Sequence, residues 1–314
     1  MSAPHPVQTL RSGGMEATIY LPDANDGFYR GTRFDWAGVI GSLKWEGHEF
    51  FGEWCERDPV GFQSITGPAD EFLSAHDIFF GGPHYDEAPV GGSWPKVGVG
   101  MLEKDVDEPF VFWKTYPIAD AGRREVEAGE RSLEFTHVVE PQANGWGYRY
   151  RKSVELDPEL PGFRLHYVFE NTGSRRYDLE VYNHNFFQID DTVVGPAYRL
   201  SFPFEVQTEK PPEGHLQVVG HEVRMSAPMG NGSFVEISGS REDANDHRFE
   251  LKNLKTGASL RCSGTLPLHR MNLWACAGAC CPEPYSRLLV ETGEVKRWTR
   301  TYELFTSEIE GVHS

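Results

Sequence analysis

Short runs in which apolar and polar residues alternate recur along the whole chain, and no stretch keeps a helical period for three turns. A period of two places apolar side chains on one face of a β-strand. With 13% aromatic residues, 33 Gly and 21 Pro, we expect an all-β fold with few, short helices. We predict strands at residues 17–21, 164–169, 179–187, 233–237, 248–251, 259–262 and 298–305.

Two short segments between these runs have the composition of tight turns. Asn171-Thr172-Gly173 and Lys255-Thr256-Gly257 each end in a glycine that tolerates positive φ, and they predict two hairpins with antiparallel pairing. Residues 61–100 break this rhythm with Gly-Pro and Gly-Gly pairs among acids and aromatics. That segment predicts a long loop system that forms a binding rim.

The domain organisation is expected to be simple. A length of 314 residues would allow two domains, but no repeat of fixed period and no low-complexity linker marks a boundary. We predict a single domain over residues 1–314, in which residues 1–14 form a flexible or edge segment.

The charge of the chain restricts its partners. The formal net charge is −17, from 30 basic and 47 acidic residues, so nucleic acids and anionic membranes are repelled and a neutral small molecule fits better. Residues 1–14 have no apolar signal region, and the longest weakly polar stretch, residues 272–281, is too short to span a bilayer. We expect a soluble cytoplasmic protein and leave its oligomeric state open.

The five cysteines do not have the spacing of a disulfide framework, which suits a reducing compartment. Cys276, Cys280 and Cys281 lie close in sequence, and His269 is the nearest candidate for a fourth zinc ligand. A structural zinc site needs four ligands with recurring spacings. We therefore predict buried thiols and no metal.

The segment from Tyr182 to Asp190 carries the strongest functional signal, because it sets His184 among amides and aromatics within a strand-like run. Sugars are recognised by aromatic faces against their C–H surface and by amide, carboxylate and imidazole groups against their hydroxyls. The alternative is a core strand in which His184 is hydrogen-bonded and inert. Side chains alternate along a strand, so His184 points opposite to Asn183 and Asn185 and shares a face with Phe186.

A second candidate lies near the C-terminus, where Glu283 stands between Pro282 and Pro284. Each proline fixes its own φ and restricts the residue before it. Glu283 is therefore presented with little backbone freedom, as a positioned base requires. The alternative is an exposed turn.

These two motifs resemble those of the galactose mutarotase-like aldose 1-epimerases, which fold as a β-supersandwich, and the general pattern extends from Tyr20 to Phe305. Asn183-His184-Asn185-Phe186-Phe187 is similar to the family's Asn-His-x-Tyr/Phe-Phe motif, and Thr292-Gly293-Glu294 resembles the turn that follows its base glutamate. The resemblance implies that His184 is the acid and Glu283 the base, with no cofactor. The family's His-Gly-Gly element is not present, and His76 and His84 are loose candidates for its second histidine.

The resemblance implies a sugar substrate and a ring-opening reaction. Glu283 would remove the proton of the anomeric hydroxyl while His184 protonates the ring oxygen, and re-closure of the open aldehyde yields the other anomer. This requires His184 to be substantially protonated near neutral pH and Glu283 to be ionised.

Further residues are candidates for binding the substrate, together with alternatives that the sequence leaves open. Basic residues would suit a hexose phosphate or a uronate, although they are as easily surface ion pairs. Carboxylates at Asp70, Glu71, Asp86 and Glu87 invite a glycosidase interpretation, and the fold also serves proteins that only bind carbohydrate. The predicted substrate-binding residues are Arg33, His76, His84, Asn183, Phe186, Asn272 and Trp274, and Arg30 and Asp35 are weaker candidates.

Overall fold

The structure is a computed structural model that describes residues 5–76, 81–241 and 243–307. Within these ranges strands dominate, and the helical elements are two 3₁₀ turns, η1 (Tyr85–Glu87) and η2 (Ile189–Asp191). Every recorded strand pairing is antiparallel. The predicted all-β fold is confirmed. None of the described helices is long and apolar enough to cross a membrane.

A ten-stranded sheet forms the base of the molecule, with the order β15-β16-β14-β18-β19-β22-β12-β11-β10-β9. One face carries alternating buried aromatic and aliphatic side chains, and the other faces solvent. Its strands are β9 (Arg123–Ala128), β10 (Ser132–Val139), β11 (Tyr148–Leu156), β12 (Gly162–Asn171), β14 (Tyr198–Ser201), β15 (Leu216–Val219), β16 (Glu222–Met225), β18 (Arg248–Asn253), β19 (Ala258–Gly264) and β22 (Val295–Thr306).

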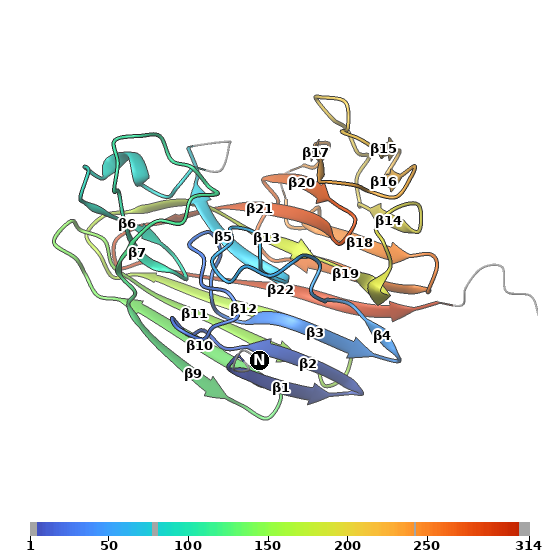
Figure 1. Ribbon diagram of the computed structural model, residues 1–314, viewed down its shortest axis with the longest axis horizontal. Coiled ribbons are helices and arrows are strands. Elements are labelled where there is room, and N and C mark those ends of the chain that lie inside the picture. The colour runs from blue at the N-terminus through green and yellow to red at the C-terminus, as the bar shows by residue number, and fades with distance from the viewer. Residues whose placement is uncertain (1–4, 77–80, 242, 308–314) are drawn as a thin grey trace, which may run out of the picture.

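A five-stranded sheet lies over the buried face of the large one, and Figure 1 shows β5, β13 and β21 above β12 and β22. Its order is β17-β20-β21-β13-β5. Burial is almost continuous along its three central strands, because both faces are covered. Its strands are β5 (Gly67–Ser74), β13 (Tyr177–Phe186), β17 (Ser233–Ile237), β20 (Arg270–Ala275) and β21 (Cys280–Val290).

Two small sheets complete the fold. One pairs β1 (Val7–Ser12), β2 (Met15–Tyr20), β3 (Val39–Trp45) and β4 (His48–Glu49), with β1 at its edge. The other pairs β6 (Ser93–Lys96), β7 (Gly100–Glu103) and β8 (Ile118–Asp120) and lies beside η1 at one end of the molecule (Figure 1).

The strand predictions are confirmed apart from single terminal residues, since all seven predicted runs fall within β2, β12, β13, β17, β18, β19 and β22. The turn at Lys255–Gly257 joins β18 and β19, which pair as a hairpin. The hairpin predicted at Asn171–Gly173 is wrong, because β12 pairs with β11 and β22 while β13 pairs with β21 and β5. That turn carries the chain from one sheet to the other.

The prediction for residues 61–100 is wrong in part. The segment holds β5, η1 and β6 in addition to loops, and β5 is a paired strand of the five-stranded sheet. Its residues 77–80 lie outside the described residues. Gly and Pro pairs punctuate these short elements, which made the segment resemble one long loop.

A buried charged cluster lies between the two large sheets. Lys152 on β11 pairs with Asp70 on β5 at 2.6 Å and lies 3.9 Å from Asp35. Tyr150 donates a hydrogen bond to Asp35 (3.1 Å), and Tyr167 donates one to Asp70 (2.9 Å). These charges are almost fully inaccessible to water and depend on one another for compensation.

Candidate active site

The outward face of β13, on the side away from the ten-stranded sheet, carries Tyr182, His184 and Phe186. Side-chain alternation places these three on one face, and each is at most 1% exposed. Residues that lie opposite each other on paired strands form rows across the sheet. One row joins His184 of β13 to Ala69 of β5, and another joins Asn272 of β20 to Glu283 of β21. The two rows meet between β13 and β21.

His184 and Glu283 are in direct contact at this point. The distance from His184 Nε2 to Glu283 Oε1 is 3.1 Å, and the two residues are 1% and 2% exposed. The two side chains proposed from sequence therefore form a buried imidazole–carboxyl pair across neighbouring strands.

The prolines around Glu283 explain how the sheet accommodates this pair. The recorded ladder between β13 and β21 ends at Tyr182 and Tyr285, just before the segment in which the prolines lack the N–H that a ladder needs. The side-chain amide of Asn185 takes over by donating to the Pro282 carbonyl (2.7 Å). Glu283 is thus held in a strand, and the alternative of an exposed turn is wrong.

Two stacked tyrosines lie beside the pair. Tyr182 and Tyr285 have ring centroids 4.1 Å apart and planes 16° apart. The Tyr285 hydroxyl donates to Glu283 Oε2 at 2.7 Å, whereas the Tyr182 hydroxyl donates to Glu71. Arg33 Nε donates to the same Glu71 oxygen at 2.8 Å.

The cations near the site already have carboxylate partners. Lys96 Nζ contacts Glu71 at 3.2 Å, and Arg33 makes the bond described above. Burial alone would raise the pKa of Glu71, but Arg33 and Lys96 hold it below its ordinary value. Glu71 is therefore ionised near neutral pH.

The pKa of Glu283 is shifted in the opposite direction from that of Glu71. Burial raises its pKa to about 7, although the Tyr285 hydrogen bond and the charges of Arg33 and Arg270 act in the other direction. A carboxyl group that titrates near neutral pH is suited to proton transfer.

The pKa of His184 is lowered well below its ordinary value by burial and by the nearby charge of Arg33. The expectation that His184 is largely protonated near neutral pH is therefore wrong for this buried site. The cause is desolvation, which disfavours the imidazolium more than the acidity of the chain as a whole favours it.

Two buried polar atoms beside the pair have no hydrogen-bond partner within the described structure. They are His184 Nδ1 and Asn272 Nδ2. An unsatisfied buried polar atom costs about 1–3 kcal/mol, and each one calls for an explanation, such as a catalytic role. A hydroxylated ligand would offer partners to both.

Aromatic rings surround His184. Phe186 stacks on the imidazole with centroids 4.1 Å apart, and Trp54 stacks on Phe186 at 5.0 Å. Phe34 meets the imidazole edge-on and Trp274 meets it at a tilt, both at 5.8 Å. These rings enclose the imidazole in a largely apolar wall.

The site is closed in this structure. Phe62 and Phe112 lie over the Arg33 guanidinium, with centroids 5.9 and 5.0 Å from Cζ. Phe62 comes from the irregular segment before β5, and Phe112 comes from the one between β7 and β8. Thr115 Oγ1 joins the two segments by donating to the Val60 carbonyl at 3.1 Å. A ligand reaches His184 and Glu283 only if covering side chains move.

The sequence-predicted binding residues fall into two groups. Arg33, Phe186, Asn272 and Trp274 all lie around the pair, as described above. Asn183 faces the core between the sheets instead, where its amide donates to Asp70 at 2.7 Å.

Neither candidate for a second histidine is recorded in contact with the pair. His76 is exposed and bonds Asp178 at 2.9 Å, and Asp178 precedes His184 by six positions on β13, a separation of about 20 Å. His84 packs at a tilt against Trp146, with ring centroids 4.1 Å apart. Asp35 lies in the core cluster rather than at the site.

The sequence analysis did not place several residues at this site, and Glu71 is one of them. Glu71, Tyr285 and Lys96 come from strands whose register is not readable from a single sequence, and Phe34 and Trp54 come from loops. One signal was available: alternation along β5 must place Asp70 and Glu71 on opposite faces.

The five cysteines are free thiols. Among the described residues no group of three or more His, Cys, Asp or Glu side chains is arranged to hold a metal ion.

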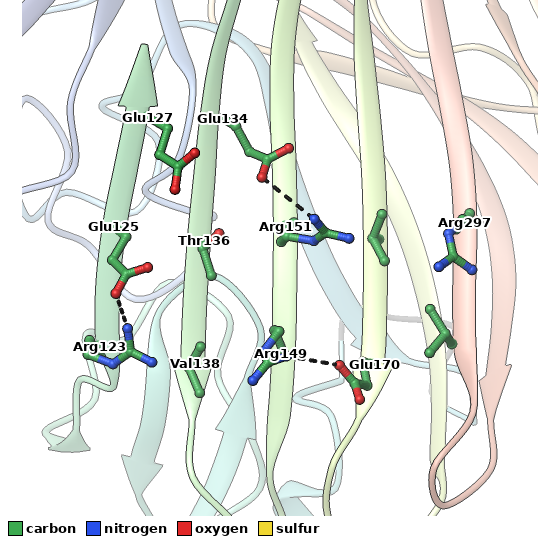
Figure 2. A pocket seen from close by; sticks show the side chains of 12 residues that line it. Arg123, Glu125, Glu127, Glu134, Thr136, Val138, Arg149, Arg151, Glu170 and Arg297 are labelled. Carbon is green, nitrogen blue, oxygen red and sulfur yellow. Dashed lines mark hydrogen bonds and ion pairs between the residues drawn. The ribbon is translucent and has the colours of Figure 1, made fainter. Parts of the chain in front are cut away.

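A large recess lies elsewhere, on the solvent face of the ten-stranded sheet. Figure 2 shows its arginine and glutamate side chains on neighbouring strands, with Arg149–Glu170 and Arg151–Glu134 ion pairs at 3.7 Å. Its volume is about 450 Å³, and its lining contains no aromatic ring. Long, exposed ion pairs of this kind are typical of a solvated sheet face.

The burial of Glu283 predicts a pH-dependent stability difference. Its folded pKa lies above the ordinary 4.5, so the contribution of the protonated form to stability is complete below pH 4.5 and is lost as pH rises through about 7. Relative to the wild type, Glu283→Gln should gain on the order of 3 kcal/mol between pH 4.5 and 7.5. Urea unfolding of both proteins at several pH values measures this, and a constant difference would contradict it.

Comparisons place the fold among known proteins. No family model matches the sequence, and no curated protein matches it. Solved structures do match over nearly the whole chain. A galactose mutarotase-like protein from Clostridium acetobutylicum has a TM-score of 0.56 at 12% identity, and 95% of each chain is covered.

Two further structures agree. A putative aldose 1-epimerase from Escherichia coli K12 has a TM-score of 0.52 at 11% identity, covering 96% of this chain and 99% of that one. A galactose mutarotase-like protein from Lactobacillus casei has a TM-score of 0.53 at 13% identity, covering 95% and 100%. The chain has the galactose mutarotase-like fold, and the predicted β-supersandwich is confirmed.

Proposed function

We propose that this protein is an aldose 1-epimerase-like enzyme that interconverts the anomers of a sugar, with His184 and Glu283 as its proton-transfer pair. The observation that carries the proposal is the buried contact of 3.1 Å between His184 Nε2 and Glu283 Oε1. The unpartnered Nδ1 of His184 and Nδ2 of Asn272 support it, because they are polar groups at the same point that a sugar can satisfy.

The reaction needs one proton on the pair. Ring opening moves a proton from the anomeric hydroxyl to the ring oxygen, so the pair must accept one proton and donate another. In the closed site that single proton rests on Glu283, because burial disfavours both charges. When the proton moves to His184, the imidazolium is the acid and the Glu283 carboxylate is the base. Rotation of the open aldehyde and re-closure then give the other anomer.

This proton count predicts the pH dependence of the rate. The pair holds one proton below the Glu283 pKa of about 7 and none above it. The lowered pKa of His184 moves the loss of activity in acid to well below pH 6.5. We expect kcat/KM to fall about tenfold per pH unit above pH 7. Exchange NMR corrected for the uncatalysed rate measures the profile, and a rate that rises steadily from pH 6 to 9 would contradict it.

The substrate is best sought with a panel of neutral hexoses, uronates and hexose phosphates. Polarimetry and exchange NMR measure anomer exchange, and calorimetry measures binding. Arg33 and Lys96 are already paired with Glu71, which favours a neutral sugar over a phosphate or uronate. Acceleration of at least one sugar supports the enzyme; tight binding without acceleration of any sugar would indicate a carbohydrate-binding protein instead.

The glycosidase alternative has less support. Glu71 accepts hydrogen bonds from Arg33, Lys96 and Tyr182, and a carboxylate with three such donors is a poor nucleophile or general acid.

A further inference from the structure

Tyr285 is so placed that it determines which oxygen of Glu283 faces His184. Its hydroxyl donates to Oε2 at 2.7 Å, and the other oxygen, Oε1, is the one that lies 3.1 Å from His184 Nε2. The two residues project from the same face of β21, two positions apart, and both are buried. Glu283 is therefore held at both ends of its carboxyl group.

We propose that Tyr285 is a positioning residue that directs Glu283 Oε1 towards His184 and biases their shared proton towards the imidazole. A phenol that donates to a carboxyl oxygen stabilises the carboxylate more than the acid. The ionised form of Glu283 is the one that acts as the base in the proposed function, on which this inference rests.

The packing around Tyr285 keeps it a donor. Its ring is sandwiched between Tyr182, at 4.1 Å, and the Arg270 guanidinium, whose Cζ lies 3.8 Å from the ring centroid. Arg270 is itself anchored by Glu180 through Nε and Nη2. Burial and the neighbouring Glu283 raise the pKa of Tyr285 well above its ordinary value, so the hydroxyl keeps its proton.

Other groups also act on Glu283, and the Tyr285 variants leave all of them unchanged. Their charges and hydrogen bonds reach it from each element packed against it. They are His184 and Tyr182 on β13, Glu71 on β5, Arg270 on β20, and Arg33 in the loop before β3.

Tyr182→Phe is a matched control for Tyr285→Phe. The two rings are stacked, both are buried, and both belong to the same network, but the Tyr182 hydroxyl donates to Glu71 rather than to Glu283. Loss of either hydroxyl leaves the ring contacts in place. A purely structural role for Tyr285 would make the two variants behave alike.

The experiment follows the titration of Glu283 by carbon-13 NMR in sugar-free protein labelled at the glutamate δ-carboxyl, with the resonance assigned from its absence in Glu283→Gln. Tyr285→Phe should move the midpoint to higher pH by about one unit, because a hydrogen bond to the charged form is lost. Tyr182→Phe should move it by less than half as much. Equal shifts in both variants, or none in Tyr285→Phe, would overturn the proposal.

A fluorotyrosine incorporated at position 285 gives a second test in case Tyr285→Phe fails to fold. The more acidic phenol is a stronger donor and should move the Glu283 midpoint to lower pH, and an unchanged midpoint would contradict the proposal. Because the readout is a titration, it succeeds or fails whether or not any sugar is turned over. If anomer exchange is found, its alkaline limb should shift by the same amount in each variant.

Discussion

Glu283→Gln is expected to slow protein-catalysed anomer exchange by about 10²–10⁴-fold, the usual contribution of a positioned proton-transfer group. Glutamine has nearly the same shape and can still accept a hydrogen bond from Tyr285, so the strand should keep its geometry. It cannot exchange a proton with His184. Exchange NMR on the sugar that gives the fastest wild-type rate measures the loss.

Two further variants sharpen this result. Glu291→Gln removes an exposed carboxylate just beyond the end of β21 and should leave the rate within about twofold of wild type. His184→Ala combined with Glu283→Gln should lose little more than the more damaging single variant, because both residues act on one proton. Independent, multiplicative losses would contradict a shared-proton pair.

Lys152→Met is expected to destabilise the protein by about 3–5 kcal/mol, the cost of removing one partner from a buried ion pair. Lys152 is 1% exposed and contacts Asp70 at 2.6 Å. Without it, two buried carboxyl groups, Asp70 and Asp35, lose their shared cation. Tyrosine hydroxyls satisfy some of their hydrogen bonds but supply no charge.

The preceding residue on the same strand provides the control. Arg151 projects to the solvent face of β11, where it pairs with Glu134 at 3.7 Å, and Arg151→Met should change stability by less than about 0.5 kcal/mol. Denaturant unfolding of both variants at pH 7 measures the contrast. Similar, small effects for the two substitutions would show that the core cluster does not depend on Lys152.

The strands and the central pair of the site were predictable because both depend on local sequence. A period of two is visible within each run, and the segments around His184 and Glu283 are compact motifs. The contact between His184 and Glu283 depends instead on the pairing of β13 with β21. These strands are far apart in sequence: Asn185 and Pro282, which share a hydrogen bond across them, are 97 residues apart. The resemblance to a known fold supplied that pairing; periodicity did not.

The features that could not be predicted from the sequence depend on contacts between distant parts of the chain. The turn at Asn171–Gly173 has the same composition whether the next strand pairs with the last or crosses to another sheet. Asn183 belongs to the recognised motif but faces the core, as the alternation of β13 requires once His184 faces outward. The lowered pKa of His184 reflects the depth of burial, which no local pattern records.

The central claim is that a sugar binds between His184 and Glu283, and a crystal structure of the sugar-bound protein tests it most directly. We predict that the pyranose lies against Trp54, Phe186 or Trp274, with its anomeric and ring oxygens within hydrogen-bond reach of Glu283 and His184. The 3.1 Å contact between these two side chains should be replaced by contacts to the sugar. A sugar bound elsewhere, with the pair still in contact, would contradict the account.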